Sequence, residues 1–446
     1  MKISIITVFP EVHETFLKLS IIGRAIEKGL VSFNLVRMAD FCQPKERIDE
    51  PTVGPGTGMI IKPEVIERAI THCEQQWGQG HKIFFSPQGV KLTQPVFRQL
   101  AKEFFRQQSQ QSIETNIEPE RSTKHIILIC PRYEGIDERV EAHYADMVVS
   151  IGDYVLMGGD VPAHVFLEGL LRLMPGIVGK WESVEHESFT GSFLDYPEYG
   201  LPVEWMGMKI PDIVQSGNHA AIDEWRTQQA CEKTKLKRFD WFATSNPDKK
   251  SMQRMAACIP PHYVALMHTQ IKLKDGSIGN TSITSIDLHD TARSCATYGV
   301  KNFFMVSPLA DQQAIIATLL DFWHSDIGKQ YNSSRFHAVN KVKPMYTFDD
   351  VIVDITQQEG KVPVIVATSA KEHAHIQKID YTQQGVVWQH NRPVLFLFGT
   401  GQGLADSLVD RCDFLLAPIR GLTEFNHLSV RSAMAVILDR WLGLKP

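Results

Sequence analysis

Two glycine-containing turns hold the residues best suited to bind a ligand. One lies in CPRYEGIDERV, residues 130–140, and the other in SIGDYVLMGGDVPA, residues 150–163. Glycine lets the backbone approach a ligand closely, and free N–H groups in such turns bind an adenine edge or a carboxylate. Tight turns of an α/β sheet have the same composition, so the two turns alone do not decide between a ligand site and a structural turn.

Short apolar runs that alternate with segments of helical period must position these turns. The alternation predicts an α/β fold with parallel strands. In the first part of the chain the predicted strands are residues 3–8, 83–86, 125–130, 147–151 and 154–157. Helices are predicted over residues 64–76 and 94–106, and the polar segment 107–124 is expected to be a solvated surface insertion.

Bulk properties exclude several classes of protein. The 446 residues leave room for two or three domains, and 43% apolar with 22% charged residues is ordinary globular composition. The N-terminus, MKISIITVFPEV, is typical of a buried strand rather than of a signal peptide. No apolar stretch approaches the roughly 20 residues that span a bilayer, so we expect a cytoplasmic protein that does not bind membranes.

Cysteine spacing and charge narrow the classes further. The seven cysteines form no CxxC pair, which argues against zinc ribbons and redox motifs and predicts reduced, mostly buried thiols. The net charge of −5 does not favour nucleic-acid binding, so a polyanion would need a local basic patch.

Two changes in composition predict domain boundaries. Residues 180–211 are rich in Glu, Gly, Pro and aromatic residues without a clear period, and NPDKKS and PP flank a polar stretch at 246–261. Beyond this second seam a new α/β pattern starts near Val264, with predicted strands at 303–306, 364–367, 394–398 and 414–417. We predict an α/β domain (1–180), a linker (181–211), a helical module (212–254) and a second α/β domain (262–446).

The order of several motifs resembles the bacterial tRNA (guanine-37-N1)-methyltransferase family. These motifs are ITVFPE (6–11), GRAIEKGLV (23–31), FFSPQG (84–89), the two glycine turns, RLMPGIVG (172–179), LDYPEYGLP (194–202) and SGNHAAIDEWR (216–226). The resemblance covers about the first 240 residues. It implies a SPOUT fold, in which a parallel sheet is tied in a deep trefoil knot, a topology too rare to follow from sequence rules. It also implies a homodimer whose composite sites are completed by the partner's linker and helical module.

The resemblance implies S-adenosylmethionine as the methyl donor, bound in a bent pose by the knot loops. The cofactor-binding residues it implies are Ser86, Pro87, Gln88, Pro131, Tyr133, Glu134, Gly135, Ile151, Gly152, Asp153, Tyr154, Val155, Leu156, Gly158, Gly159 and Pro162. The sulfonium already activates the methyl group, so the transfer itself requires no metal and we predict no metal ligands.

Methylation of guanine N1 sets its own chemical requirements. N1 carries a proton at neutral pH, so the reaction needs a base near N1 and a positive group near O6, where negative charge accumulates. By family position, Glu187 is the base and Arg172 the O6 stabiliser. If the local register shifts, Glu185 or His186 takes the place of Glu187.

The sequence departs from the family pattern at three places. The family usually has Asp where Glu187 stands, so the carboxylate is one methylene farther from the backbone and N1 must sit differently. Pro131 stands where Gly is typical, which removes a backbone donor beside the cofactor. The family's glycine-rich loop reads PTVGPGTGM at 51–59. These departures leave the fold prediction intact and concern catalytic efficiency.

A basic segment is the candidate tRNA-binding surface. Residues 226–254 contain eight Lys and Arg against three acids, interleaved with aromatic residues. Such a segment neutralises phosphates and stacks bases, or it forms a solvated helix face over a small core. The resemblance favours contact with the anticodon arm near G37, whose target base would be flipped into the pocket. The predicted tRNA-binding residues are Ser216, Asn218, His219, Arg226, Lys235, Lys237 and Arg238.

The C-terminal part carries a second set of motifs. DLHDTARSCATYGV (287–300), FLFGTGQGL (396–404) and the strand, loop and helix from Leu415 onward resemble SpoU-type SPOUT RNA methyltransferases. Asp287 stands where those enzymes usually have Asn, and the segment resembles more closely an uncharacterised bacterial SPOUT family. The resemblance implies a second cofactor site. It also implies that Arg293 serves catalysis or RNA binding, and that Gly399, Gly401, Gly403, Ile419 and Leu428 line the cofactor loops.

The leading hypothesis is therefore an N1-guanine tRNA methyltransferase fused to a second SPOUT domain of unknown target. Its product would be 1-methylguanosine on the 3′ side of the anticodon. One alternative is an RNA-binding protein whose methyltransferase sites have decayed, which Pro131 and Glu187 motivate. Another makes the C-terminal domain the main enzyme, acting on ribose or another base, with the first domain supplying affinity for tRNA.

Overall fold

The structure is a computed structural model that describes residues 1–55, 58–105, 125–179, 181–185, 187–370 and 375–445. The predicted insertion at 107–124 lies outside these residues. The chain divides into two compact units, unit 1 (residues 1–190) and unit 2 (residues 191–446), and each is described by itself.

Unit 1 is built on a parallel sheet with strand order β2-β1-β6-β5-β7. Its strands are β1 (Lys2–Thr7), β2 (Ser32–Arg37), β5 (Gly80–Lys91), β6 (His125–Ile129) and β7 (Met147–Ser150). The central strand β6 is wholly buried because each face of the sheet carries its own core. Ile126 and Leu128 face one core, and Ile127 and Ile129 face the other. This is the near-continuous apolar pattern typical of parallel strands.

Seven α-helices surround this sheet in the described part of unit 1. They are α1 (Glu11–Lys18), α2 (Ser20–Glu27), α3 (Pro63–Trp77), α4 (Gln94–Phe104), α5 (Glu138–Tyr144), α6 (Asp160–Leu171) and α7 (Glu182–Glu185). A short 3-10 helix (Met38–Phe41) and the hairpin of β3 (Asp49–Pro51) and β4 (Met59–Ile61) complete the unit. Both predicted helices are confirmed as α3 and α4.

Four of the five strands predicted in this part are confirmed to within a few residues, and one is wrong. Residues 154–157 form no strand and lie in an exposed loop, where Val155 is 83% and Met157 87% exposed. A short apolar run is typical of a buried strand, but here the apolar side chains are exposed. The sequence analysis also omitted β2, the edge strand that pairs with β1.

Unit 2 contains a seven-stranded parallel sheet with strand order β14-β13-β10-β17-β15-β18-β16. Its strands are β10 (His262–Met267), β13 (Asn302–Val306), β14 (Val342–Met345), β15 (Val364–Thr368), β16 (Gln377–Ile379), β17 (Val394–Gly399) and β18 (Phe414–Leu416). The four strands predicted here correspond to β13, β15, β17 and β18. Hairpins β8 (Glu204–Trp205) with β9 (Met208–Lys209) and β11 (Ile271–Lys272) with β12 (Ile278–Gly279) lie outside this sheet.

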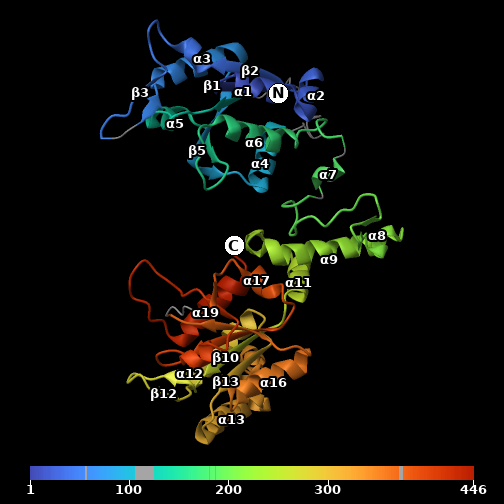
Figure 1. Cartoon of the computed structure of the whole chain (residues 1–446), viewed down its shortest axis with the longest axis vertical. Helices are drawn as coiled ribbons and strands as arrows, with labels where there is room; N and C mark the ends of the chain where they lie inside the picture. The colour runs from blue at the N-terminus through green and yellow to red at the C-terminus, as the bar shows by residue number, and fades with distance from the viewer. Residues whose placement is uncertain (56–57, 106–124, 180, 186, 371–374, 446) are drawn as a thin grey trace. The chain divides into compact units, whose positions relative to one another are not determined.

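Helices cover both faces of this second sheet, as Figure 1 shows for α12 and α16 on either side of β10 and β13. The helices are α8 (Asp212–Gln215), α9 (His219–Lys237), α10 (Phe239–Thr244), α11 (Lys249–Cys258), α12 (Ser285–Thr297), α13 (Ala310–His324), α14 (Asp326–Tyr331), α15 (Ser333–Val339), α16 (Phe348–Glu359), α17 (Gln384–Trp388), α18 (Asp406–Val409) and α19 (Val430–Leu442). None of the helices in the described part of the chain has the length and apolar character needed to cross a bilayer.

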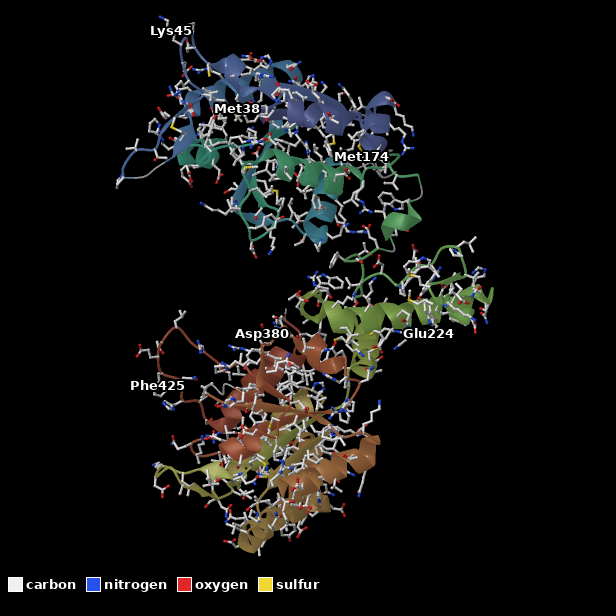
Figure 2. All side chains as sticks on the ribbon, in the orientation of Figure 1. Met38, Lys45, Met174, Glu224, Asp380 and Phe425 are labelled. Carbon is white, nitrogen blue, oxygen red and sulfur yellow. The ribbon has the colours of Figure 1, made fainter. Side chains whose placement is uncertain are left out.

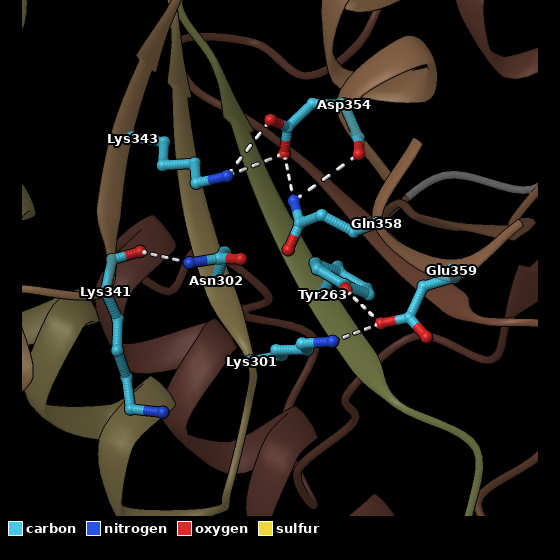
Figure 3. Close-up of polar contacts among 8 residues, drawn as sticks. All are labelled: Tyr263, Lys301, Asn302, Lys341, Lys343, Asp354, Gln358 and Glu359. Atoms are coloured by element: carbon cyan, nitrogen blue, oxygen red, sulfur yellow. Dashed lines mark hydrogen bonds and ion pairs between the residues drawn. The ribbon is translucent and has the colours of Figure 1, made fainter. Parts of the chain in front are cut away.

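Polar contacts hold α16 on its face of the sheet (Figure 3). The Tyr263 hydroxyl and the Lys301 ammonium both donate to Glu359 Oε1, each at 2.5 Å. At the other end of the cluster, Lys343 Nζ donates to both oxygens of Asp354 at 2.9 and 3.0 Å. These side chains line neither large cavity of the described chain, so the cluster anchors α16 on the sheet.

Two further expectations can be compared with the structure. The seam predicted at 246–261 holds α11, whose Met255 and Cys258 enter the same core as the second sheet. The polar stretch there is the exposed side of an amphipathic helix. The seven cysteines are free and six of them are buried, which confirms the predicted thiols.

Candidate active sites

Three segments meet near the carboxyl end of the sheet in unit 1. Strands β6, β5 and β7 are neighbours. Residues 86–88 in the irregular part of β5, residues 131–135 after β6, and most of residues 151–159 after β7 line a cavity of about 270 Å³. Parallel strands end at one edge of a sheet, which is where α/β folds bind their ligands. Every predicted cofactor-binding residue lines this cavity except Asp153, whose carboxylate accepts a hydrogen bond from Lys91 Nζ at 2.7 Å.

Glycines allow two of these loops to cross in contact. The Gly159 N–H donates to the Pro131 carbonyl at 2.8 Å. A Cβ on Gly159 would lie 2.5 Å from Pro131 Cδ, and one on Gly158 would lie 2.5 Å from Arg132 Cδ. Glycine is therefore required at both positions. The carbonyl of Pro131 holds the crossing, so the N–H that proline lacks is not needed for it.

Arg132 is a charged residue of this cavity that the resemblance did not assign. Its Nε donates to Asp160 Oδ2 at 2.9 Å, and its guanidinium carbon lies 5.1 Å from the centroid of the Phe9 ring. Asp160 is 1% exposed and also accepts hydrogen bonds from Thr7 Oγ1 at 2.5 Å and from His13 Nε2 at 3.0 Å. The sequence signal was a carboxylate at the first residue of α6, directly after the Gly158–Gly159 pair.

The environment of Asp160 favours its charged form. Burial by itself raises the pKa of this carboxyl, but hydrogen bonds from His13 and Thr7 and the charge of Arg132 hold the pKa below its usual value. His13, Cys130 and Asp160 have potential metal-ligating atoms within 4.8 Å of one another. Asp160 Oδ1 accepts hydrogen bonds from Thr7 and His13, and Oδ2 accepts one from the Arg132 guanidinium. The carboxylate therefore holds Arg132 in place and is not available to a metal ion.

Arg172 and Glu187, the two catalytic residues that the resemblance implied, form an ion pair. Arg172 follows the last residue of α6, and its Nη1 donates to Glu187 Oε1 at 2.8 Å while Nη2 donates to Oε2. Gln94 Nε2 donates to the same carboxylate at 3.0 Å. The hydrogen bond to Glu187 raises the pKa of Arg172, so the guanidinium stays charged. Neither Arg172 nor Glu187 lines the cavity of its own unit.

The alternative bases are placed differently. Glu185 is exposed and accepts a hydrogen bond from Trp181 Nε1 at 3.1 Å. His186 lies outside the described residues. Among the described residues near Arg172, Glu187 is the carboxylate that pairs with it.

Most predicted tRNA-binding residues are at the surface of unit 2. Ser216, Asn218 and His219 are exposed at the start of α9, where Asn218 Oδ1 caps the helix by accepting from the Ala221 N–H at 3.2 Å. The Arg226 guanidinium lies 4.6 Å from the centroid of the Tyr196 ring. Lys237 is exposed, and Arg238 Nε donates to Asp240 at 3.2 Å.

Lys235 requires a correction. Its side chain is 2% exposed, and its ammonium donates to the Cys258 carbonyl at 3.2 Å and pairs with Glu232. Because α11 covers this face of α9, the charge of Lys235 serves the packing of the two helices and is not available to a phosphate. Composition alone could not reveal which basic residues face the core.

A second cavity of about 540 Å³ lies in unit 2 at the carboxyl ends of β15, β17 and β18. The residues predicted to line the second cofactor loops, Gly399, Gly401, Gly403, Ile419 and Leu428, all line it. The glycine turn is held by a hydroxyl pair, Thr281 and Thr400, whose oxygens lie 2.5 Å apart. Gly401 has φ +58°, a conformation in which glycine avoids strain.

Arg293, for which the resemblance implied catalysis or RNA binding, lies outside this cavity. It is exposed on α12 and does not line the cavity, because it lies on another face of the helix than Asp287. The arginine that lines the cavity is Arg431, near the start of α19. Arg431 Nη1 lies 3.3 Å from Asp287 Oδ1, and Arg431 Nε lies 3.8 Å from Asp290 Oδ2. The sequence feature that could have indicated Arg431 is a basic residue at the start of the helix that follows the loop FNHLS (425–429).

Comparisons with known proteins give the following similarities. Residues 1–108 and 104–244 match the tRNA (Guanine-1)-methyltransferase TrmD family, and residues 261–443 match a SAM-dependent RNA methyltransferase family. A tRNA (guanine-N(1)-)-methyltransferase of Nitratidesulfovibrio vulgaris is 34% identical over 99% of both chains, and one of Oleidesulfovibrio alaskensis is 33% identical over the same shares. The crystal structure of the tRNA (m1G37) methyltransferase from Aquifex aeolicus is 30% identical, with a TM-score of 0.42, and the match covers 54% of this chain and 94% of that chain.

Proposed function

The chain belongs to the tRNA (guanine-N1)-methyltransferase family and carries a second, SAM-dependent RNA methyltransferase domain, and from this premise we propose how it works. It is an enzyme that methylates N1 of a guanine in tRNA with S-adenosylmethionine as methyl donor. We assign the target to G37, next to the anticodon, because the order of motifs in the first 240 residues resembles that of the guanine-37 enzymes.

The cavity of unit 1 is the proposed site of S-adenosylmethionine. Its lining combines glycines, exposed backbone and the apolar residues Val155 and Leu156, which suits an adenosyl group. When bound, this cofactor supplies a methyl group on a positively charged sulfur. The crossing at Gly158 and Gly159 fixes the two loops that would hold it. The hydrogen bond from Arg132 to Asp160 holds these loops in place relative to each other.

Glu187 and Arg172 are the proposed catalytic residues. As N1 forms its bond to the methyl carbon, the carbon–sulfur bond breaks with its electron pair left on sulfur, and the N1 proton passes to Glu187. Arg172 balances the negative charge that collects on O6. The observation that carries this assignment is the direct pairing of the two side chains.

A homodimer with composite sites completes the proposal. Arg172 and Glu187 do not line the cavity of their own unit, so we assign them to the cavity of a partner subunit. An apolar surface beside the cavity supports such an interface. Val155, Met157, Val161 and Val165 are between 43% and 87% exposed in the single chain. The deep trefoil knot of a SPOUT fold would account for the crossing of the loops at residues 131–135 and 151–159.

The remaining assignments follow the predicted domain order. Residues 1–180 form the first SPOUT domain, 181–211 the linker, 212–254 the tRNA-binding module and 262–446 a second SPOUT domain. In the module, Ser216, Asn218, His219, Arg226, Lys237 and Arg238 are proposed to contact the anticodon arm. We place the enzyme in the cytoplasm, where it meets tRNA.

The position of the methyl group is the test. A tRNA transcript with G36 and G37 is incubated with the full chain and S-adenosylmethionine, digested, and examined by nucleoside mass spectrometry. We expect 1-methylguanosine from this transcript and none from a matched transcript with A37. Equal formation from both transcripts would overturn the assignment to G37.

A further inference from the structure

The helical module of unit 2, here meaning α8 to α11, shares one hydrophobic core with the second α/β domain. Phe239 in α10 and Trp388 in α17 form a T-shaped aromatic pair, with ring centroids 4.8 Å apart. Phe242 and Met255 are buried in the same cluster as Trp388 and Trp441. Separating the module from the domain would expose these large apolar side chains to water, so the two remain joined.

Backbone contacts and a buried histidine tighten this connection. A Cβ on Gly385 of α17 would overlap the Leu236 carbonyl oxygen of α9, so the two helices touch through their backbones. His262 Nε2 accepts hydrogen bonds from the indole N–H groups of Trp388 at 3.2 Å and Trp441 at 3.1 Å. Burial lowers the pKa of His262 to about 4, which keeps this acceptor neutral. An RNA bound to the module is therefore held in a fixed orientation to the second cavity.

The surface charge of the module suits an RNA. Residues 226–254 contain eight Lys and Arg and three acids, although the chain as a whole has a net charge of −5. Lys237, Lys249 and Lys250 are exposed, as phosphate contacts require. This local excess of positive charge lies in the same compact unit as the second cavity.

The mouth of the second cavity offers a surface for an unpaired base. Asn426, His427 and Leu428 line it. The same loop carries Phe425, 76% exposed, which Figure 2 shows on a loop at the edge of the unit. Its ring lies 5.4 Å from that of His427. Exposed aromatic rings beside a pocket stack on unpaired bases, the usual means by which proteins read single-stranded RNA.

The cavity also contains a base for proton transfer. Asp287 is the one carboxylate among its described lining residues, and it is 9% exposed. Thr284 Oγ1 donates to its Oδ2 at 2.6 Å, and Arg431 pairs with its Oδ1. This arrangement holds the carboxylate in a fixed orientation beside the cavity. It repeats in unit 2 the carboxylate–arginine pairing that Glu187 and Arg172 form in unit 1.

We infer that the second cavity methylates an unpaired nucleotide of the same tRNA that the helical module holds, with Asp287 as the base. The acceptor oxygen or nitrogen forms a bond to the methyl carbon of S-adenosylmethionine. The carbon–sulfur bond breaks with its electron pair left on sulfur, and the acceptor proton passes to Asp287. The inference rests on the proposed binding of tRNA by the module.

The test uses the full chain, S-adenosylmethionine, the same unmodified tRNA transcript, and an unmodified ribosomal RNA transcript in a separate reaction. Nucleoside mass spectrometry reports 1-methylguanosine and any second methylated nucleoside from one digest. We expect the second nucleoside in tRNA, still present in Glu187→Gln and reduced at least about a hundredfold in Asp287→Asn. Asp321→Asn is the matched control, because Asp321 is exposed on α13 of the same unit and does not line the cavity, and it should retain the second nucleoside.

A charge reversal tests the role of the module. Lys237→Glu should reduce the second methylation of tRNA, whereas Lys361→Glu, at another exposed lysine of unit 2, should not. The inference is overturned if the second methyl group appears only in ribosomal RNA, if no second nucleoside forms in either RNA, or if it persists in Asp287→Asn. If the wild-type chain forms the second nucleoside but no 1-methylguanosine, the proposed function of unit 1 is contradicted and this inference stands.

Discussion

Arg172 and Glu187 form an ion pair through both guanidinium Nη atoms, and Gln94 donates a further hydrogen bond to the same carboxylate. The pair therefore exists before any substrate is present. A guanine could insert its N1–O6 edge between these side chains. Its N1–H would then donate to Glu187 and its O6 would accept from Arg172, in place of the hydrogen bonds that the two side chains make with each other. The charges are kept in place by the end of α6 and by Gln94, which lowers the cost of arranging them during the reaction.

Replacement of Arg172 should impair the chemical step more than the binding of tRNA. We expect Arg172→Ala to lower the single-turnover rate of 1-methylguanosine formation by about 10²–10³-fold, as for the loss of one donor to a developing oxyanion. Arg172→Lys should restore part of the rate, because it keeps the charge but not the two-nitrogen geometry. A filter-binding measurement with tRNA separates affinity from rate, and an Arg172→Ala variant with full rate would remove Arg172 from the mechanism.

The crossing of the cofactor loops should not tolerate a methyl group at Gly159. A Cβ there would lie 2.5 Å from Pro131 Cδ and 2.8 Å from the Cys130 Cα, so Gly159→Ala must displace the loop. Isothermal titration with S-adenosylmethionine should give two sites per wild-type chain, one in each cavity, and one site in this variant. Gly179→Ala is the control, since a Cβ at that position meets nothing within 4 Å. Two sites in Gly159→Ala would refute this role for the crossing.

The buried carboxylate of Asp160 should make unit 1 sensitive to acid. Its pKa in the folded chain lies below the usual value of 3.8, so it contributes stability above about pH 4 that is lost as the pH falls through the folded pKa. Asp160→Asn should destabilise the protein by about 3 kcal/mol at neutral pH, since it leaves Arg132 without its partner charge.

Denaturant unfolding between pH 7 and pH 3 measures both effects. The stability difference between wild type and Asp160→Asn should be constant above pH 5 and shrink below pH 4. A difference that grew toward low pH would mean that Asp160 is protonated in the folded protein. Asp153→Asn is suitable as the control because Asp153 is exposed.

Mixing two inactive variants tests whether the sites are shared between subunits. Glu187→Gln removes the base, and Gly159→Ala removes the cofactor cavity. If each site joins the cavity of one subunit to Glu187 of the other, a heterodimer of the two variants has one intact site. Mixed subunits should then regain about a quarter of the wild-type rate. No recovery after verified subunit exchange would place the complete site within one chain.

Much of unit 1 could be predicted because its signals are local. The buried strands β1, β5, β6 and β7 are short apolar runs, and the cofactor loops follow them at the same edge of the sheet. The predicted strand at 154–157 failed because apolar residues were read as buried, whereas Val155 and Met157 are exposed. The type of a residue does not by itself determine whether its side chain is buried or exposed.

The unexpected positions of Lys235 and Arg293 have a related cause. Lys235 and Arg293 were chosen by residue type and motif position, but the helix face decides what each side chain meets. Lys235 faces α11, and Arg293 faces away from the cavity that Arg431 lines. Arg132 was missed because its role depends on Asp160, which lies 28 residues away in the chain. A contact between residues so far apart in the chain forms only in the folded protein, where the two loops lie against each other.

The most direct test of the account is the single-turnover rate of 1-methylguanosine formation on the G37 transcript with Glu187→Gln. Glutamine keeps the hydrogen-bonding shape but cannot take the N1 proton, so the rate should fall by at least about a hundredfold. Glu185→Gln, two residues away and bonded to Trp181, should react at close to the wild-type rate. If Glu187→Gln kept the wild-type rate, or if the loss followed Glu185 instead, the assignment of Glu187 as the base would be contradicted.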